Sequence, residues 1–295
     1  MTIPQRPDGA PPLTTRSDRV RRVRTLSGRS ARHRAGRFVV EGPQGVREAV
    51  VAHAEALAAG RPPVVLELYA GPGLAVRHQG LLASARAAGL AVRAVGDDVL
   101  AAMADTVTPQ GVLAVCALVD VPLSAVLGPA GGGRPRLVAV LAGVSDPGNA
   151  GTVIRAADAA GADAVVLGAT SVDVHNPKCV RSTAGSLFHL PVVSGADLPQ
   201  TLGALRAAGM GVLAADGAGD VDLDDLQDHA QEGAGPLHDP VAWVFGNEAH
   251  GLGDDVLALA DAVVRVPVHG RAESLNLATA ATVCLYASAR ALRRR

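Results

Sequence analysis

The sequence predicts an α/β protein with two domains. Strand-like and helix-like segments alternate along the chain, and a glycine-rich stretch interrupts this alternation once. The chain has 295 residues, of which 48% are hydrophobic, so it can form two cores of ordinary size. Aromatic residues make up only 2%, so the cores must consist mainly of Ala, Val and Leu. This composition argues against an RNA-recognition sheet that stacks several aromatic side chains on bases.

The first half of the chain carries short apolar segments typical of strands, separated by amphipathic segments. A strand is predicted at 38–40, and the Gly42-Pro43 pair marks the turn after it. Helices are predicted at 44–59, at 74–88 and from about 97, because apolar residues recur there at helical spacing. Further strands are predicted at 64–68, 90–95 and 111–118. The segment before residue 36 is expected to be a flexible arm that becomes helical around 17–26.

Three consecutive glycines at 131–133, flanked by Pro129 and Pro135, indicate a linker. The unbroken apolar run at 137–144 is typical of a buried parallel strand. More strands are predicted at 164–167, 212–215, 241–245 and 262–266. The expected helices are 150–160, 177–184, 198–208, 252–260 and 275–293, and 216–235 is expected to be an acidic loop. The predicted domains are an arm (1–35), a first domain (36–120), a linker (121–136) and a second domain (137–295).

Basic residues are concentrated at the two ends, although the net charge is only −1. Lys178 is the only lysine among 27 basic residues. The first 40 residues hold ten arginines against Asp8 and Asp18, and the chain ends with three arginines. Clusters of this kind suit a polyanionic partner such as a nucleic acid. A solubilising tail is the alternative interpretation.

Several common classes of protein are disfavoured. The three cysteines are far apart and odd in number, which indicates a reducing compartment. No apolar run approaches the roughly 20 residues that span a membrane, and the arginine-rich start lacks the apolar core of a secretory signal. We therefore expect a cytoplasmic protein without a membrane partner. Neither a P-loop nor zinc-ligand spacing is present, so no metal is expected.

Three polar segments of the second domain indicate a site. They are Ser145–Arg155, Val244–Gly253 and Val266–Ala278, and each follows an apolar strand and precedes a helix. Open α/β sheets place ligands at this edge. Each segment alone has a simpler explanation, because Asn and Ser cap helices and a long Arg side chain can reach water. Their convergence at one edge of a sheet favours a functional site.

These segments resemble the three motifs of the SpoU (TrmH) family of RNA ribose 2′-O-methyltransferases, in the SPOUT superfamily. The motif residues are Asn149 with Arg155, then Gly246-Asn-Glu248, then Ser274-Leu-Asn276. The first domain, through Arg37–Gly42 and Thr108–Ala114, is similar to the L30e-like substrate-binding domain of such enzymes. Residues before Arg37 and the acidic loop at 216–235 fall outside the resemblance.

The resemblance implies a trefoil-knotted parallel sheet, S-adenosylmethionine as cofactor and a homodimer. The final helix, with Leu277, Ala280, Ala281, Cys284 and Ala287, is the expected dimer face. Backbone groups at Gly246, Val266 and Leu275 are expected to hold the cofactor. Arg37, Arg181 and Arg271 are expected to contact RNA.

The resemblance also implies roles in methyl transfer. Arg155 would activate the ribose hydroxyl or anchor a neighbouring phosphate, and anchoring is favoured because a guanidinium stays protonated. Glu248 would position Arg155 or the ribose. Asn149, Ser274 and Asn276 would orient the hydroxyl by hydrogen bonds.

Structured RNA is the predicted substrate, with 23S rRNA favoured over tRNA because the L30e-like domain is commoner among rRNA enzymes. A tRNA methyltransferase is one alternative. An RNA-binding protein that has lost catalysis is another, although the intact motif residues argue against it.

Overall fold

The computed structural model describes residues 12–128 and 134–293, and the chain divides into two compact units. Unit 1 comprises the residues up to Val119 together with His175–His189, and unit 2 comprises Asp120–Val174 and the chain from Leu190 onward. The ring of Phe38 lies 4.6 Å from that of His175 and 6.2 Å from that of Phe188, measured between centroids. This ring cluster explains why the segment 175–189 belongs to unit 1, which a helical pattern alone could not indicate.

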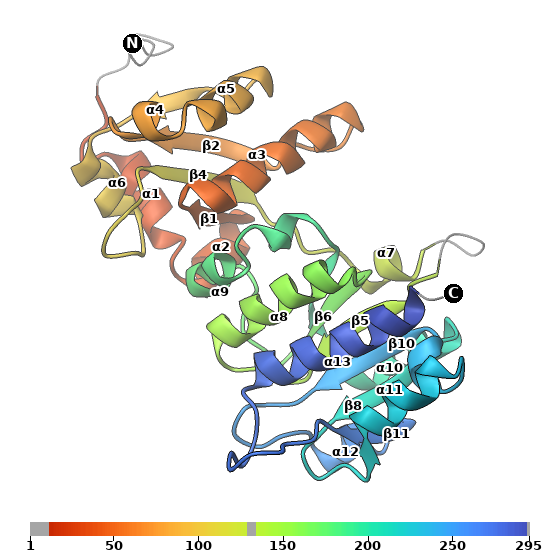
Figure 1. Cartoon of the computed structure of the whole chain (residues 1–295). Helices are drawn as coiled ribbons and strands as arrows, with labels where there is room; N and C mark the ends of the chain where they lie inside the picture. Colours follow the sequence, from red (N-terminus) through yellow and green to blue (C-terminus); the bar gives the residue numbers. More distant parts are fainter. Residues whose placement is uncertain (1–11, 129–133, 294–295) are drawn as a thin grey trace. The chain divides into compact units, whose positions relative to one another are not determined.

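Unit 1 is built on a four-stranded mixed sheet in the order β1-β4-β2-β3 (Figure 1). The strands are β1 (Arg37–Glu41), β2 (Val65–Ala70), β3 (Val92–Ala94) and β4 (Val112–Ala117). Strand β4 runs antiparallel to β1 and β2, while β2 and β3 are parallel. The helices are α1 (Asp18–Thr25), α2 (Arg29–Ala35), α3 (Pro43–Ala58), α4 (Leu74–Arg77), α5 (Gln79–Ala87), α6 (Asp97–Met103) and α9 (Pro177–Ser182), with a 3₁₀ turn at Ser186–Phe188.

Residues 18–35 form two helices. Helix α1 agrees with the helix predicted around 17–26, whereas the folding of this stretch into unit 1 corrects the prediction of a flexible arm. Val20, Val23 and Leu26 are buried in one core with residues of α6 and the sheet. Arg32 is only 2% exposed, and its Nη1 donates to the backbone oxygens of Leu26 at 2.9 Å and Ser27 at 2.6 Å. The apolar residues recur every three positions on one face of α1, and this face is what ties the helix to the core. Residues 1–11 of the predicted arm lie outside the described residues.

Unit 2 contains a seven-stranded parallel sheet in the order β7-β6-β5-β10-β8-β11-β9. The strands are β5 (Leu137–Leu141), β6 (Ala164–Gly168), β7 (Val192–Ala196), β8 (Gly211–Ala215), β9 (Val221–Asp222), β10 (Val241–Phe245) and β11 (Ala262–Arg265). Every residue of β5, β6 and β10 is buried, as expected of central parallel strands. The α/β fold class is confirmed, while the knot stays a prediction.

Helices cover both faces of this sheet. Helices α8 (Pro147–Ala160) and α13 (Leu277–Leu292) lie side by side on one face (Figure 1). The buried indole Nε1 of Trp243 in β10 donates to Ser288 Oγ of α13 at 2.8 Å, so a buried hydrogen bond joins helix and sheet. On the opposite face, Ala242 and Val244 pack with residues of α10 (Leu198–Ala207) and α12 (Asp254–Leu257).

Several predicted boundaries in unit 2 need correction. The predicted acidic loop contains β9 and helix α11 (Leu223–Gln231), because Leu223, Leu226 and Ala230 form a buried helical stripe under an acidic surface. Helix α7 (Leu123–Leu127) lies within the predicted linker, and 129–133 lies outside the described residues. Strand β7 was not predicted. Within the described ranges, no helix is long and apolar enough to cross a membrane.

Candidate active site

The site lies in unit 2, where three chain segments meet beyond the carboxyl ends of parallel strands. Strands β5 and β10 are direct neighbours in the sheet, so the loops that follow them start at the same edge. The β5 loop leads into α8, the β10 loop carries residues 246–251, and the loop after β11 leads into α13. This edge is where open parallel sheets hold their ligands.

The Glu248 carboxylate connects the β10 loop to the start of α8. Its Oε2 accepts a hydrogen bond from the backbone N–H of Ser145 at 3.1 Å, and its Oε1 accepts from the backbone N–H of Asp146 at 3.1 Å. Oε1 also accepts from Asn149 Nδ2 at 3.0 Å. One carboxylate therefore satisfies three donors of the neighbouring motif.

Asn149 links this carboxylate to the third motif. Asn276 Nδ2 donates to Asn149 Oδ1 at 3.1 Å, while Asn276 Oδ1 caps α13 by accepting from the Ala278 N–H at 2.9 Å. The sequence suggested Asn149 as the cap of α8, but the structure places Asp146 in that role. The Asp146 side chain accepts a hydrogen bond from the Asn149 N–H at 2.9 Å. The Asn149 side chain is therefore free to join the other two motifs.

The ionisation of Glu248 follows from these contacts. Partial burial of the carboxyl acts to raise its pKa. The hydrogen bonds from the Asn149 side chain and from the Ser145 and Asp146 backbone outweigh that effect, so the pKa of Glu248 lies below its usual value of 4.5. The group is an anion at neutral pH, suited to accepting hydrogen bonds and poorly suited to taking up a proton.

Asn247 also shapes the site, although sequence reasoning did not single it out. Its Nδ2 donates to Gly143 O at 2.7 Å and to Ser145 Oγ at 2.8 Å, and its Oδ1 accepts from the Ala249 N–H at 2.9 Å. A Gly-Asn pair at the end of a strand, whose asparagine bonds a backbone N–H two residues on, is typical of such a turn, and this signal could have been read from the sequence.

Gly246 permits a tight backbone approach within the same loop. A Cβ at this position would lie 2.4 Å from the carbonyl carbon of Gly251. Asn247 and Gly251 exchange backbone hydrogen bonds of 2.8 and 2.9 Å directly beside it. The structure thus explains the glycine by the packing of the loop on itself.

Two of the residues expected to hold the cofactor, Val266 and Leu275, lie in the loop that connects β11 to α13. No backbone N–H or C=O of this loop pairs with another backbone group of the described chain. An adenine ring presents both donors and acceptors on its edge, so unpaired peptide groups are suitable partners. The loop therefore fits a purine-containing cofactor.

The remaining predicted residues are not part of the Glu248 network. Arg155 is exposed on α8, and its side chain forms neither a hydrogen bond nor an ion pair with the described residues, so the expected pairing with Glu248 is absent. Ser274 and Arg271 are exposed in the loop before α13 and likewise lack partners among the described residues. They are available to a ligand but not preorganised.

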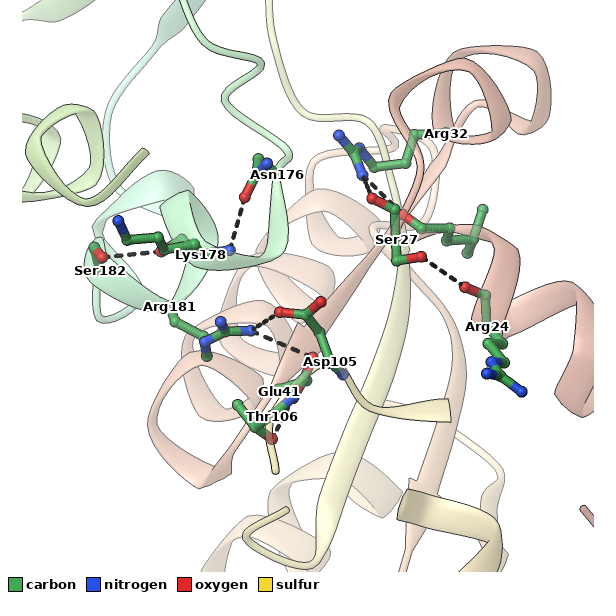
Figure 2. A network of polar contacts seen from close by, with 11 residues as sticks. Arg24, Ser27, Arg32, Glu41, Asp105, Thr106, Asn176, Lys178, Arg181 and Ser182 are labelled. Atoms are coloured by element: carbon green, nitrogen blue, oxygen red, sulfur yellow. Dashed lines mark hydrogen bonds and ion pairs between the residues drawn. The ribbon is translucent and has the colours of Figure 1, made fainter. Parts of the chain in front are cut away.

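Two arginines predicted to contact RNA lie in unit 1 and are paired with carboxylates there. Arg181 Nη1 lies 3.0 Å from Asp105 Oδ2 and 3.6 Å from Glu41 Oε1 (Figure 2). Arg37 Nη1 lies 3.7 Å from Glu67 Oε1. The charge of Arg181 is therefore largely compensated within its own unit. No group of three or more metal-ligating side chains occurs among the described residues.

Comparison with known proteins agrees with this geometry. Residues 136–286 match the SpoU rRNA Methylase family, and residues 17–114 match the MRM3-like substrate binding domain. Both matches reach beyond the resemblance seen in the sequence, since they include residues before Arg37 and the whole of 216–235. Fold and site define a methyltransferase that acts on RNA and carries a substrate-binding domain. The chain belongs to the SpoU rRNA methylase family.

Individual relatives extend this comparison. The chain is 32% identical over 273 residues to the 23S rRNA (guanosine(2553)-2′-O)-methyltransferase RlmP of Bacillus subtilis, covering 92% of this chain and 96% of the relative. A crystal structure of an AdoMet-bound rRNA methyltransferase from Sinorhizobium meliloti superimposes with a TM-score of 0.75 and 29% identity, covering 95% of this chain and 96% of that one. The crystal structure of the methyltransferase AviRb of Streptomyces viridochromogenes, in complex with AdoMet, superimposes with a TM-score of 0.72 and 32% identity. This match covers 93% of this chain and 98% of AviRb.

Proposed function

We propose that this protein transfers the methyl group of S-adenosylmethionine to a ribose 2′-hydroxyl of 23S rRNA. The observation that carries the proposal is the hydrogen-bonded chain Glu248–Asn149–Asn276, which joins all three motifs at the ligand-binding edge of the sheet. The relatives whose names specify 23S rRNA support the substrate. An rRNA substrate also assigns the protein to the cytoplasm, where ribosomes are assembled.

The two asparagines are the groups best placed to orient the ribose. Each primary amide has two N–H donors and an oxygen with two lone pairs. Asn149 uses one donor on Glu248 and one lone pair on Asn276, so one of each remains for a ligand. Asn276 likewise keeps one donor and one lone pair. Because both amides are held by other contacts, they can present these groups with little loss of entropy on binding.

Arg155 is proposed as the phosphate anchor. Its guanidinium is exposed and has no carboxylate partner in the described chain, so it can form bidentate hydrogen bonds with a phosphate next to the target ribose. Ser274 would add a hydroxyl partner to the ribose. In this scheme Glu248 contacts neither the ribose nor Arg155, and acts as a positioning residue for Asn149.

Gly246, Val266 and Leu275 are the residues that would hold the cofactor through their backbone groups. When bound, S-adenosylmethionine would supply a methyl group on a positively charged sulfur. The ribose oxygen forms its new bond to the methyl carbon as the carbon–sulfur bond breaks, the sulfur leaves as a neutral thioether, and the hydroxyl proton is released to water. The chain contributes by fixing the ribose and excluding competing orientations. Holding the two reactants close together in the correct orientation accelerates such a transfer.

We also propose a homodimer that forms through α13. The face expected from the sequence was wrong in part, because Ala281 and Cys284 are fully buried within unit 2. The exposed stripe of α13 instead carries Val283, 38% exposed, and Tyr286, 49% exposed. A Tyr286→Arg variant should therefore sediment as a monomer while the wild type sediments as a dimer. An unchanged sedimentation coefficient would place the interface elsewhere or show that the chain is monomeric.

The proposed reaction is tested with isotopically labelled S-adenosylmethionine and total RNA that lacks the modification. Label should appear in a 2′-O-methylnucleoside of large-subunit rRNA. The Arg155→Ala variant should lose transfer and keep its affinity for S-adenosylmethionine, while Arg86→Ala, which removes an exposed arginine from α5, should transfer normally. Label in tRNA would overturn the substrate, and normal transfer by Arg155→Ala would remove Arg155 from the mechanism.

A further inference from the structure

We propose that a cavity in unit 1 binds one unpaired nucleobase of the substrate RNA. This inference rests on the proposed function, because it concerns how the same RNA is recognised. The cavity has a volume of about 240 Å³ and is lined by the end of β1, the start of α3, the 104–110 segment and helix α9. All of these elements belong to unit 1.

The cavity wall is built around a buried carboxylate. Glu41, whose side chain is only 7% exposed, accepts hydrogen bonds from the backbone N–H groups of Asp105 at 2.9 Å and Thr106 at 3.2 Å. It also accepts from Thr106 Oγ1 at 2.7 Å, and Arg181 lies beside it (Figure 2). These contacts hold the loop before β4 in place, so the cavity is a preorganised feature of the unit.

Charge decides which part of an RNA strand fits this cavity. Glu41 and Asp105 contribute two negative charges close to the cavity, against the single positive charge of Arg181. This balance repels a phosphate. The other polar side chains in the lining, Gln44, Thr108 and Gln110, are neutral and form no hydrogen bonds with the described residues. Unpaired neutral donors and acceptors match the edge of a nucleobase.

The apolar lining supports the same ligand. Val40, Leu100 and Leu113 belong to the buried core and line part of the cavity wall. A nucleobase has two apolar faces and one polar edge, so it can contact both kinds of wall at once. A phosphate has no apolar face to offer these residues, and a ribose has no flat one. Sequence-specific RNA recognition commonly uses bases that are splayed out of the strand in this way.

A neighbouring hollow offers a place for the strand that carries the base. It has a volume of about 220 Å³ and shares Glu41 and Ala104 with the cavity. Arg24 also lines it, and this exposed side chain has no carboxylate partner among the described residues (Figure 2). Because the Arg24 side chain is exposed and points away from Glu41 and Asp105, a phosphate next to the bound base can pair with it from the solvent, while the base occupies the cavity.

The proposal is tested by filling the cavity. The Thr108→Trp variant places an indole at the cavity rim, and the matched control Ala101→Trp places the same ring on an exposed position of α6. Binding of fluorescently labelled 23S rRNA fragments is measured by titration without cofactor. We expect Thr108→Trp to weaken binding on the order of tenfold, the typical effect of losing one recognised base, and Ala101→Trp to bind like the wild type.

A second variant covers the case in which Thr108→Trp does not fold, as judged by its thermal melting. Gln110→Ala removes a polar group from the cavity without adding bulk, and should also weaken RNA binding. The affinity for S-adenosylmethionine, which depends on unit 2, should stay unchanged in every variant. If folded cavity variants bind the rRNA fragments as tightly as the wild type, the proposal is wrong even if the wild type methylates rRNA.

Two further results separate this proposal from related ones. The four nucleoside 5′-monophosphates are added as competitors, and they should displace the rRNA fragment only weakly. Strong displacement by one of them, lost in Thr108→Trp, would instead show a site for a free nucleotide. If the wild type binds rRNA fragments but methylates none, the proposed function fails while the cavity proposal stands on its binding data.

Discussion

At the scale of single residues, Glu248 shows how a charged group can serve a reaction without exchanging a proton. Three donors surround its carboxylate, and they lower its pKa below the usual 4.5. A group that must accept a proton near neutral pH needs a raised pKa. Glu248 therefore holds the Asn149 side chain in position by a hydrogen bond, and it does not contact Arg155.

Replacing Glu248 by Gln should reduce methyl transfer through Asn149. The new amide nitrogen would face an N–H donor in place of an acceptor, which costs about 1–3 kcal/mol, with the lower end expected because the side chain is exposed. We expect kcat to fall on the order of tenfold, while Glu232→Gln on an exposed position after α11 has no effect.

The pH profile provides an independent measurement. A depressed carboxyl pKa stabilises the site above the unfolded value, and that stabilisation is lost as pH falls through the lowered folded pKa. Wild-type activity should therefore show no ionisation of Glu248 between pH 6 and 9, a range chosen around neutrality well above the usual Glu pKa of about 4.3. If the pH profile of the wild type shows an inflection near neutral pH that disappears in Glu248→Gln, Glu248 acts as a proton acceptor and the positioning role is wrong.

The same residues show how far sequence reasoning reaches. The convergence of Asn149, Glu248 and Asn276 at one sheet edge could be predicted, because the ends of the strands and the order of the motifs can be recognised in the sequence. The particular atoms that form hydrogen bonds with one another could not be predicted. The cap of α8 depends on whether Asp146 or Asn149 takes the backbone N–H, and both residue types cap equally well.

At the scale of elements, His53 joins helix α3 to strand β2. Its buried ring accepts a hydrogen bond at Nδ1 from the backbone N–H of Val65 at 3.1 Å. Burial lowers the pKa of this imidazole from 6.5, although a backbone contact at Ala88 opposes that effect. The neutral ring is required, because a protonated Nδ1 cannot accept the hydrogen bond.

Unit 1 should therefore lose stability in mild acid. A histidine with a lowered folded pKa stabilises the fold above the unfolded value of about 6.5, and this contribution is lost as pH falls from there toward the folded pKa. The His53→Asn variant keeps an acceptor oxygen near the Nδ1 position and does not titrate. Thermal melting should show a smaller loss between pH 7.5 and 5.5, on either side of the ordinary histidine pKa of about 6.5, in His53→Asn than in the wild type. Equal losses in both proteins would assign the acid sensitivity to other groups.

Elements with mixed signals were the ones that the sequence concealed. Helix α11 carries a strongly acidic surface over three buried apolar residues, so its composition suggested a loop. Helix α2 was hidden in the same way by arginines, whereas the helix predicted around 17–26 corresponds to α1. The central strands β5, β6 and β10 were evident because every residue is buried and apolar, and no polar face competes with that pattern.

At the scale of the whole molecule, the basic amino-terminal helices contribute both to the core of unit 1 and to its charged surface. Val20, Val23 and Leu26 are part of a core, whereas Arg16, Arg22, Arg29 and Arg34 are exposed. Of these four arginines, Arg22 interacts electrostatically with Asp18, and the other three have no carboxylate partner among the described residues. Deleting residues 1–35 would expose the core of unit 1 and would not isolate the contribution of charge. Substitution of the exposed arginines leaves that core intact.

The quadruple variant with Arg16, Arg22, Arg29 and Arg34 replaced by Ala should bind rRNA more weakly and with a weaker salt dependence. Each lost phosphate contact lowers the slope of log K against log salt by about 0.7 on single-stranded RNA, so four contacts lower it by about 3. The double variant Arg61→Ala with Arg86→Ala, which removes exposed arginines elsewhere in unit 1, should keep the wild-type slope. A wild-type slope in the quadruple variant would mean that these arginines maintain solubility alone, and that the phosphate contacts of the protein lie on other surfaces such as Arg155 and Arg271.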